Sequence, residues 1–298
     1  MKANNKITAK QPLVSILMPV FNAGSFLEEA IQSIRTQTLR NWELLIIDDG
    51  STDDSYKIMK TQATFDTRIK LFRNKSNQGL VKSLNKIIPF TRGIFVARMD
   101  ADDVSLPRRL QKQVTYLRRH PDVVACGGQE LIIDETGINI AYKYFPTEPD
   151  ACYRMIANFM VIQPPLLMAW GNVFRSLRYD NHIFKNDDIS MHFKLLRFGS
   201  FGNVDEILFK YRKRINSITH NNPKKVFFLA LAVRLNAIQK HQYKINLNSA
   251  LTLIAETVIV GILPNELLIK LFEIIRYTTK LDLHIAKRIN LGLSRAFT

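Results

Sequence analysis

The sequence predicts an α/β fold with a mostly parallel, doubly wound, Rossmann-like sheet and a helical extension at the C-terminal end. Short apolar runs of strand length alternate with segments of helical periodicity over the first 110 residues or so. From about residue 104 to 219 the pattern is less regular, and after residue 220 it is largely helical and basic. A chain of 298 residues is long enough to bury a substantial core.

The first strand and helix are expected within residues 13–37. Residues 13–20, LVSILMPV, form a short apolar run rich in β-forming side chains. In the segment SFLEEAIQSIRTQ an apolar stripe with the spacing i, i+3, i+4, i+7 begins at Leu27, which predicts an amphipathic helix. Ser25 and Glu28 have the spacing of a capping box at its start.

The following elements continue the alternation. Residues 42–48, WELLIID, are a continuous apolar run, as expected for a strand buried on both faces of the sheet. DGSTDDSYKIMK predicts a second helix, with Ser51 or Thr52 as its N-cap. The strands IKLF and IFVARM, with a helix at about residues 78–89 between them, complete the pattern.

The second half contains two further helices and a strand-rich segment. Pro107 is expected in the first turn of the helix PRRLQKQVTYLRRH. The segment VVACGGQELIIDETGINIAYKYF predicts strands with turns, and the acidic pair Asp187–Asp188 begins another helix.

Polar side chains follow three of the predicted parallel strands directly. The carboxyl ends of such strands border the crevice in which open α/β sheets bind ligands. Carboxylates and an aromatic ring are therefore expected to meet there. The first strand is followed by Pro19, Phe21 and Asn22, the second by Asp48 and Asp49, and the fourth by Asp100, Asp102 and Asp103. Asp103 is expected to act only at the start of the helix that follows Pro107.

Charge and cysteine usage restrict the class of protein. The chain has 42 Lys and Arg against 26 Asp and Glu, a net charge of +16, which suggests an anionic partner such as nucleic acid, a phosphorylated substrate or a membrane surface. Cys126 and Cys152 lack the CxxC spacing of a zinc site, and two cysteines are too few for a disulfide framework. Both observations fit a reducing compartment. No signal peptide or spanning segment is evident, so a cytoplasmic protein is expected, with attachment to a membrane face as an open alternative.

Two stretches carry a resemblance to a known family. VSILMPVFNAGSFLEEAIQSIRTQTLRNWELLIIDDGSTDDS, followed by ARMDADDVSLPRRLQKQVTYL, closely resembles the family-2 inverting glycosyltransferases of bacterial surface-polysaccharide synthesis, which have the GT-A fold. The resemblance implies a polar tail at residues 1–11, a GT-A domain at 12–220 and a basic helical extension at 221–298. Within the domain it implies a nucleotide-sugar half, 12–103, and an acceptor half, 104–220.

The resemblance also implies roles for individual residues on the donor side. Pro19, Phe21 and Asn22 would line the nucleotide base and ribose, and Asp49 would accept a hydrogen bond from uracil. Asp100 and Asp102 would be the DxD pair, with Asp102 binding a divalent metal, Mn²⁺ or Mg²⁺, and Asp100 binding the ribose or the metal. The donor would be a nucleoside-diphosphate sugar, most simply a UDP-sugar.

On the acceptor side, the resemblance makes Asp188 the catalytic base and places Arg212 and Arg214 in a loop that closes over the diphosphate. The acceptor would be a glycan or a lipid-linked glycan. Simpler interpretations stay open: an N-cap for Asp188, core packing for Phe21 and a solvated strand edge for the two arginines. Arg214 stands where the family often has a metal-binding His, so the metal would have fewer protein ligands or would use His220.

Two other functions are weighed against this one. A nucleotide-sugar pyrophosphorylase would need a Gly-rich basic loop after the first strand, and PVFNAGSF has one glycine and no basic residue. A nucleic-acid-binding protein would interleave aromatic and basic residues, and here carboxylates line the expected crevice, so no nucleic-acid partner is expected. The basic amphipathic segment NELLIKLFEIIRYTTKL could lie on an anionic membrane or pack on the domain.

Overall fold

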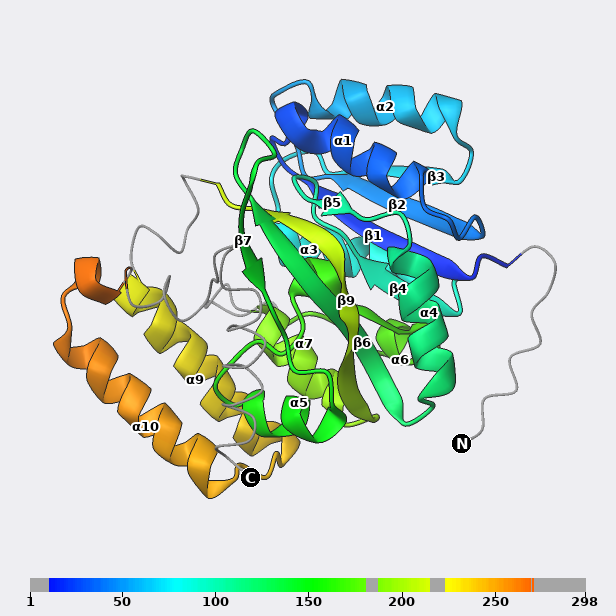
Figure 1. The fold of residues 1–298 in the computed structure, drawn as a ribbon. Coiled ribbons are helices and arrows are strands. Elements are labelled where there is room, and N and C mark those ends of the chain that lie inside the picture. Colours follow the sequence, from blue (N-terminus) through cyan, green and yellow to red (C-terminus); the bar gives the residue numbers. More distant parts are fainter. Residues whose placement is uncertain (1–10, 181–186, 215–222, 269, 271–298) are drawn as a thin grey trace.

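The computed structural model describes residues 11–180, 187–214, 223–268 and 270, and its centre is a nine-stranded mixed sheet covered by helices (Figure 1). The strand order is β3-β2-β1-β4-β8-β6-β9-β5, and β7 pairs with β6. This arrangement confirms the α/β fold class and the helical C-terminal part.

The first half of the sheet is entirely parallel. It consists of β1 (Val14–Val20), β2 (Trp42–Asp48), β3 (Ile69–Arg73) and β4 (Phe95–Arg98). The connecting helices are α1 (Gly24–Arg35), α2 (Ser55–Phe65) and α3 (Leu80–Ile87), which continues into a 3-10 turn at Ile88–Phe90. The predicted apolar stripe of α1 is fully buried, which confirms the helical periodicity that begins at Leu27.

The helix starts differ from the sequence-based expectation, because Asp53 caps both helices, α1 from a distant position and α2 from two residues before its start. Ser25 lies inside α1 and forms no capping box; the N–H of Gly24 donates instead to Oδ2 of Asp53, at 2.9 Å. Oδ1 of the same carboxylate accepts the N–H of Ser55 at 3.0 Å, so α2 begins at Ser55. Ser51 and Thr52 were therefore the wrong caps.

The second half of the sheet mixes parallel and antiparallel pairs. Its strands are β5 (Val104–Ser105), β6 (Val123–Ile133), β7 (Asn139–Lys143), β8 (Met168–Trp170) and β9 (Ser200–Arg212). Its helices are α4 (Arg109–Arg119), α5 (Pro149–Met155), α6 (Gly171–Ser176) and α7 (Asp187–Leu196), with a 3-10 turn at Pro164–Leu166. Pro107 precedes α4 by two residues instead of opening it.

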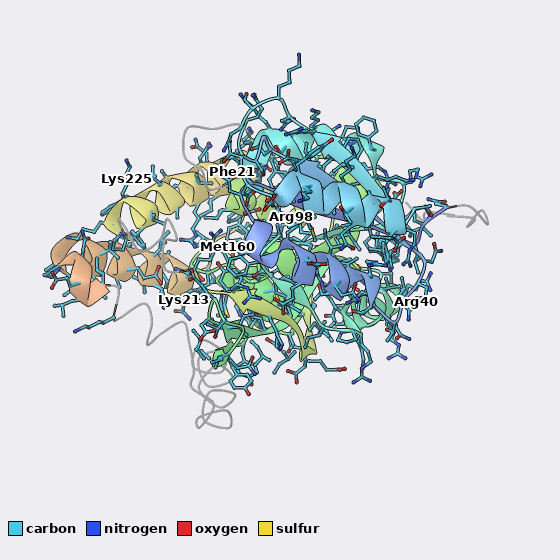
Figure 2. All side chains as sticks on the ribbon, turned by 90° about the horizontal axis from the view of Figure 1, so that it is seen from above. Phe21, Arg40, Arg98, Met160, Lys213 and Lys225 are labelled. Carbon is cyan, nitrogen blue, oxygen red and sulfur yellow. The ribbon has the colours of Figure 1, made fainter. Side chains whose placement is uncertain are left out.

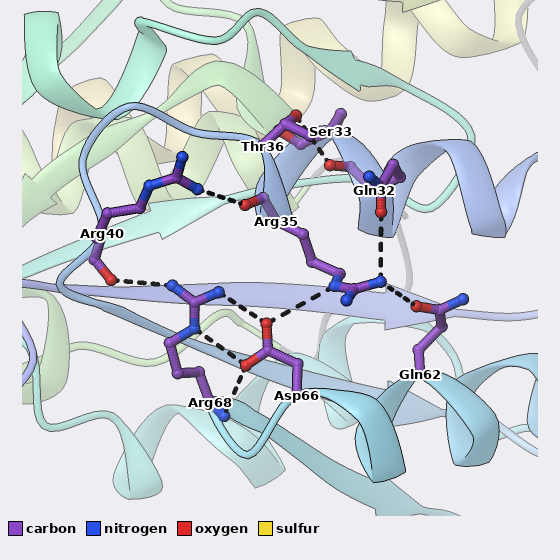
Figure 3. A network of polar contacts seen from close by, with 8 residues as sticks. All are labelled: Gln32, Ser33, Arg35, Thr36, Arg40, Gln62, Asp66 and Arg68. Atoms are coloured by element: carbon purple, nitrogen blue, oxygen red, sulfur yellow. Dashed lines mark hydrogen bonds and ion pairs between the residues drawn. The ribbon is translucent and has the colours of Figure 1, made fainter.

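Two polar networks fix the amino ends of the parallel strands. The carboxylate of Glu43 in β2 accepts from Ser15 Oγ in β1 at 2.7 Å and from the side chain and N–H of Arg92, just before β4. A second network joins the ends of α1 and α2 to the loops before β2 and β3 (Figure 3). Its centre is the bidentate pair of Arg68 with Asp66, at 2.7 and 3.0 Å.

The helical C-terminal part packs on the rest of the chain. It comprises α9 (Pro223–His241) and α10 (Leu247–Ile262), which lie side by side (Figure 1). Ala237 and Tyr243 join the apolar core that contains Phe193 of α7. Asn158 donates to the carbonyl oxygen of Ser249 at 3.0 Å. None of the described helices is long and apolar enough to cross a membrane.

Both cysteines are free and buried, in agreement with the absence of a disulfide framework. Burial raises the pKa of Cys152 to about 12 and also raises that of Cys126.

We expect Asp53→Ala to lower the free energy of unfolding by about 0.5–2 kcal/mol, because one carboxylate caps two helices. The neighbouring Asp54→Ala is the matched control, since its exposed side chain makes neither of these bonds. Burial alone raises the pKa of Asp53, but hydrogen bonds from Ser55 and Gly24 bring it below 3.8. The difference between wild type and Asp53→Ala should therefore be present above pH 4 and shrink as the pH falls further. Urea unfolding at pH 7 and pH 3 measures both effects, and equal losses in the two variants would contradict the capping role.

Candidate active site

The candidate site lies at the carboxyl edge of β1, β2 and β4. β1 pairs in parallel with both neighbours, with Val20 opposite Asp48 and Leu17 opposite Arg98. The loops that follow these strands therefore leave the sheet side by side. In Figure 2, which looks down on the molecule, Phe21 and Arg98 lie near the middle of the view.

The loop after β1 presents an aromatic ring at this edge. Phe21 is 46% exposed, whereas Pro19 inside β1 is partly buried. Asn22 adopts a φ of 48°, and its Oδ1 accepts the N–H of Thr52 at 2.9 Å. The N–H of Asn22 donates to Ser51 Oγ at 3.1 Å. The loops after β1 and β2 are thus tied together, and the ring of Phe21 is left at the surface.

Asp49 is almost fully buried and organises the loop between β3 and α3. Its Oδ1 accepts from Asn74 Nδ2 at 2.7 Å and from the N–H of Gln78 at 2.9 Å. Its Oδ2 accepts the N–H of Gly79 at 2.8 Å, in a turn where Gly79 has a φ of 88°. Each carboxylate oxygen can accept about two hydrogen bonds, so Oδ2 retains capacity for one more.

The two DxD carboxylates are partly exposed at the same edge. The side chain of Asp100 is 35% exposed and that of Asp102 is 26% exposed. Burial, together with the negative charge of Asp100, raises the pKa of Asp102 to about 6. Arg214 opposes this shift from 3.8 Å. Asp102 is therefore a carboxylate that additional positive charge would stabilise.

Asp103 has a different role from its neighbours. It is buried, lies just before β5 and accepts the N–H of Arg212 through Oδ1 at 2.8 Å. Burial and the charges of Asp102 and Asp100 raise its pKa well above 3.8. Instead of starting the helix after Pro107, Asp103 joins the β5 region to the end of β9.

Arg98 is the residue at this site that the sequence analysis missed. Its side chain is 1% exposed, at the end of β4. Nη2 donates to Asp100 Oδ1 at 3.0 Å, and Nη1 donates to Asp188 Oδ1 at 3.2 Å and to Tyr179 Oη at 3.0 Å. A signal was available, because an arginine within the apolar run IFVARM must find buried partners. Which partners it finds depends on the fold.

Asp188 is brought to the donor side through this contact. It lies in the first turn of α7 with its side chain 29% exposed, and of the described residues only Arg98 contacts its carboxylate. Asp188 and Asp100, from the two halves of the chain, thus share one buried cation. The side chain of Asp187 lies outside the described residues.

The two arginines at the end of β9 lie in different environments. The side chain of Arg212 is 2% exposed, and all its nitrogens are engaged: Nε with the carbonyl of Asp102, Nη1 with the carbonyls of Asp134 and Glu135, and Nη2 with Glu29. The side chain of Arg214 is 44% exposed. The structure therefore brings Arg214, and not the guanidinium of Arg212, to the surface of the crevice.

Two side chains of the site, Asp100 and Asp102, are suitable ligands for a hard divalent cation. Among the described residues no three His, Cys, Asp or Glu converge as a complete metal-binding set. Asp100 and Asp102 nevertheless supply partly exposed oxygens of the type that Mg²⁺ and Mn²⁺ prefer. Burial first, and then the charge of Asp100, raises the pKa of Asp102, so a cation at its carboxylate would stabilise the charged form. His220 lies outside the described residues.

Comparison with known proteins identifies the class. The sequence model described as "Glycosyl transferase family 2" matches residues 15–204. The chain is 34% identical over 207 residues to the "Putative glycosyltransferase EpsE" of Bacillus subtilis, which covers 68% of this chain and 73% of the relative. It is 27% identical to the "Putative teichuronic acid biosynthesis glycosyltransferase TuaG" of the same species, over 75% of this chain and 89% of the relative.

Solved structures agree on the fold. Staphylococcus aureus TarS, residues 1–349 in complex with UDP-GlcNAc, superposes with a TM-score of 0.56 at 15% identity, over 83% of this chain and 81% of that chain. The mannosyltransferase PcManGT from Pyrobaculum calidifontis, in complex with GDP-Man and Mn²⁺, superposes with a TM-score of 0.55 at 15% identity, over 87% and 83%.

The architecture is therefore that of a GT-A glycosyltransferase. The chain belongs to glycosyltransferase family 2, whose members are inverting enzymes. The resemblance seen in the sequence is confirmed, and the match favours a glycosyltransferase over a nucleotidyltransferase.

We expect Arg212→Met to lower the free energy of unfolding by about 3 kcal/mol, because it leaves several buried acceptors unpaired. Arg214→Met should change it by less than about 0.5 kcal/mol, since the side chain is nearly half exposed. Urea unfolding of the two variants beside the wild-type protein measures this difference. Equal stability of both variants would show that the bonds of Arg212 are unimportant.

Proposed function

We propose that this enzyme transfers a sugar from a nucleoside-diphosphate donor, a UDP-sugar, to a hydroxyl group of a glycan or glycolipid during synthesis of a surface polysaccharide such as lipopolysaccharide or capsule. The observation that carries the proposal is the meeting of Asp100 and Asp188 at Arg98, at the same sheet edge as the exposed ring of Phe21. The names of TuaG and the bound nucleotide sugars of TarS and PcManGT support it by analogy.

The donor base is proposed to stack on Phe21, whose exposed ring would otherwise be an unfavourable surface feature. Pro19 and Asn22 complete this wall next to the ribose. The ring N–H of uracil would donate to Oδ2 of Asp49, which accepts one bond in the free protein. A carboxylate acceptor matches this N–H donor, which uracil shares with thymine.

The diphosphate is proposed to lie between Asp102 and Arg214. Asp102 and Asp100 would hold Mn²⁺ or Mg²⁺, which when bound neutralises charge that develops on the leaving oxygen. Arg214 would donate to the phosphate oxygens, as a guanidinium can do in a bidentate manner. These residues together stabilise the departing nucleoside diphosphate.

Asp188 is proposed as the general base. Arg98 engages one oxygen of the Asp188 carboxylate. The other carboxylate oxygen would accept the proton of the acceptor hydroxyl while the hydroxyl oxygen attacks the anomeric carbon. Attack from the face opposite the diphosphate inverts the anomeric centre. A single carboxylate suffices for this step.

The domain division is proposed as residues 12–220 for the GT-A domain, with halves at 12–103 and 104–220, and 221–298 for the extension. Of this extension, α9 packs on the domain, because it contributes to the same core as α7. The enzyme is proposed to be cytoplasmic, where nucleotide sugars and free buried thiols are both compatible with the surroundings.

An anionic membrane surface is the proposed site of the acceptor. Most of the amphipathic segment that the sequence suggested lies outside the described residues. Another feature supports the same idea: α10 exposes an apolar stripe at helical spacing. The adjacent α9 and the connection after it carry the exposed residues Lys225, Lys240 and Lys244. The stripe consists of Leu247, Leu251, Ile254, Val258 and Ile262, each more than half exposed.

A thermal-shift screen of UDP-, GDP- and dTDP-sugars with Mn²⁺ should identify the donor, and two variants then test the roles. Asp102→Asn should raise the Mn²⁺ concentration needed for half-maximal turnover by at least tenfold. Asp188→Asn should lower kcat by about 10²–10⁴-fold while leaving the Mn²⁺ requirement unchanged. Asp150→Asn, an exposed carboxylate on α5, is the control. Wild-type turnover in both site variants would refute the assignment.

For the membrane, Ile254→Gln combined with Val258→Gln should reduce co-sedimentation with phosphatidylglycerol vesicles by about tenfold. Binding to phosphatidylcholine vesicles should be weak in every case, because the lysines attract only an anionic surface. Phe65→Gln, at an equally exposed apolar position on α2, controls for general hydrophobicity. Unchanged sedimentation of the double variant would exclude α10 as the contact.

A further inference from the structure

The guanidinium of Arg98 is a rigid bridge between the two sides of the reaction centre. Its two terminal nitrogens contact carboxylates that are 88 positions apart in the sequence, Asp100 at 3.0 Å and Asp188 at 3.2 Å. Both carboxylates are partly exposed, while the guanidinium between them is 1% exposed. The cation therefore lies beneath the two carboxylates, which reach the surface.

The geometry of this bridge is determined by the shape of the side chain. A guanidinium is planar and its donors have a fixed fork arrangement, so two carboxylates bound to different terminal nitrogens have a fixed separation and orientation. Tyr179, which is 5% exposed, accepts a third bond at 3.0 Å and holds the fork in its plane from the buried side. A lysine has one nitrogen on a flexible stem and cannot replace this arrangement.

Each of the two carboxylates keeps one oxygen that Arg98 does not engage. Arg98 engages Oδ1 of Asp100 and Oδ1 of Asp188. Among the described residues no donor contacts Oδ2 of either side chain. The contact to Arg98 restricts the rotation of each carboxylate, so the remaining oxygen has a preferred direction before any substrate arrives.

We propose that Arg98 is the positioning residue of this enzyme, which orients the base Asp188 relative to the donor-side carboxylate Asp100. The inference rests on the proposed function, since it takes Asp188 to be the base. Arg98 itself touches neither donor nor acceptor, because its side chain is buried beneath the two aspartates. Its contribution is to the alignment of acceptor and donor.

The expected kinetic signature follows from this role. Misplacement of a catalytic group by about 1 Å can cost 10²-fold in rate. Arg98→Met should therefore lower kcat by about 10²-fold and change KM for the donor by less than about threefold. Arg98→Lys keeps the buried charge and should recover only a small part of the loss. Tyr179→Phe, which leaves both carboxylate contacts in place, should lose much less than Arg98→Met.

A double-mutant cycle separates positioning from a general structural role. The assay is release of nucleoside diphosphate with water as acceptor, using the UDP-sugar with the largest thermal shift. If Arg98 acts through Asp188, Arg98→Met should cost much less in the Asp188→Asn background than in the wild-type protein. Independent, multiplicative losses would overturn the inference, as would an unchanged kcat in Arg98→Met and Arg98→Lys.

A second readout does not depend on the donor. The melting temperatures of the Arg98→Lys, Asp188→Asn and doubly substituted proteins should be non-additive if the two side chains are coupled as described, and additive shifts would also overturn the inference. Coupled melting temperatures together with full turnover in Asp188→Asn would instead reject Asp188 as the base. That result would refute the proposed function and leave the Arg98 bridge as a structural contact only.

Discussion

The parallel pairing of β1 with β2 and β4 is the constraint on which the site depends. Because β1 is central to both pairs, its register determines where three loops leave the sheet. Glu43 fixes this register at the amino ends by joining β1, β2 and the start of β4 through one carboxylate. At the carboxyl ends the loops are tied through Asn22 and Asp49, and Arg73 of β3 pairs with Asp48 of β2. The partly exposed carboxylates Asp100 and Asp102 lie at this second edge.

At the carboxyl edge of the sheet, the aspartates have nearer partners within the protein than the sequence suggested. Three aspartates within four residues seemed to need an external cation. In the folded chain each has an arginine nearby: Arg98 for Asp100, Arg214 for Asp102 and the backbone of Arg212 for Asp103. Only Asp102 has a loose partner, at 3.8 Å, together with a pKa raised to about 6. Of the two partly exposed carboxylates, Asp102 is therefore the one with the weaker arginine contact.

The parts of the molecule that follow from local pattern were predictable, and the parts that follow from distant contacts were not. Continuous apolar runs such as that of β2 and the stripe that begins at Leu27 identify the elements and the crevice directly. The cap of α1 comes from Asp53, nearly thirty residues away, so the local Ser25–Glu28 pattern misled. The same holds for Arg212. Its position at the end of a strand suggests an exposed side chain, but the fold brings Glu29 and Asp134 into contact with it. Arg98 was overlooked because its partners lie on separate elements.

The two buried thiols have a practical consequence for spectroscopy. Neither Cys126 nor Cys152 presents a thiolate to solvent, since burial raises the pKa of both. A maleimide dye or nitroxide spin label therefore has no native target on the folded surface formed by the described residues. One cysteine introduced on α3 and another on α10 would suffice for distance measurements by fluorescence transfer or pulsed electron resonance. Motion of the helical extension relative to the donor half could thus be followed during turnover without first removing any natural residue.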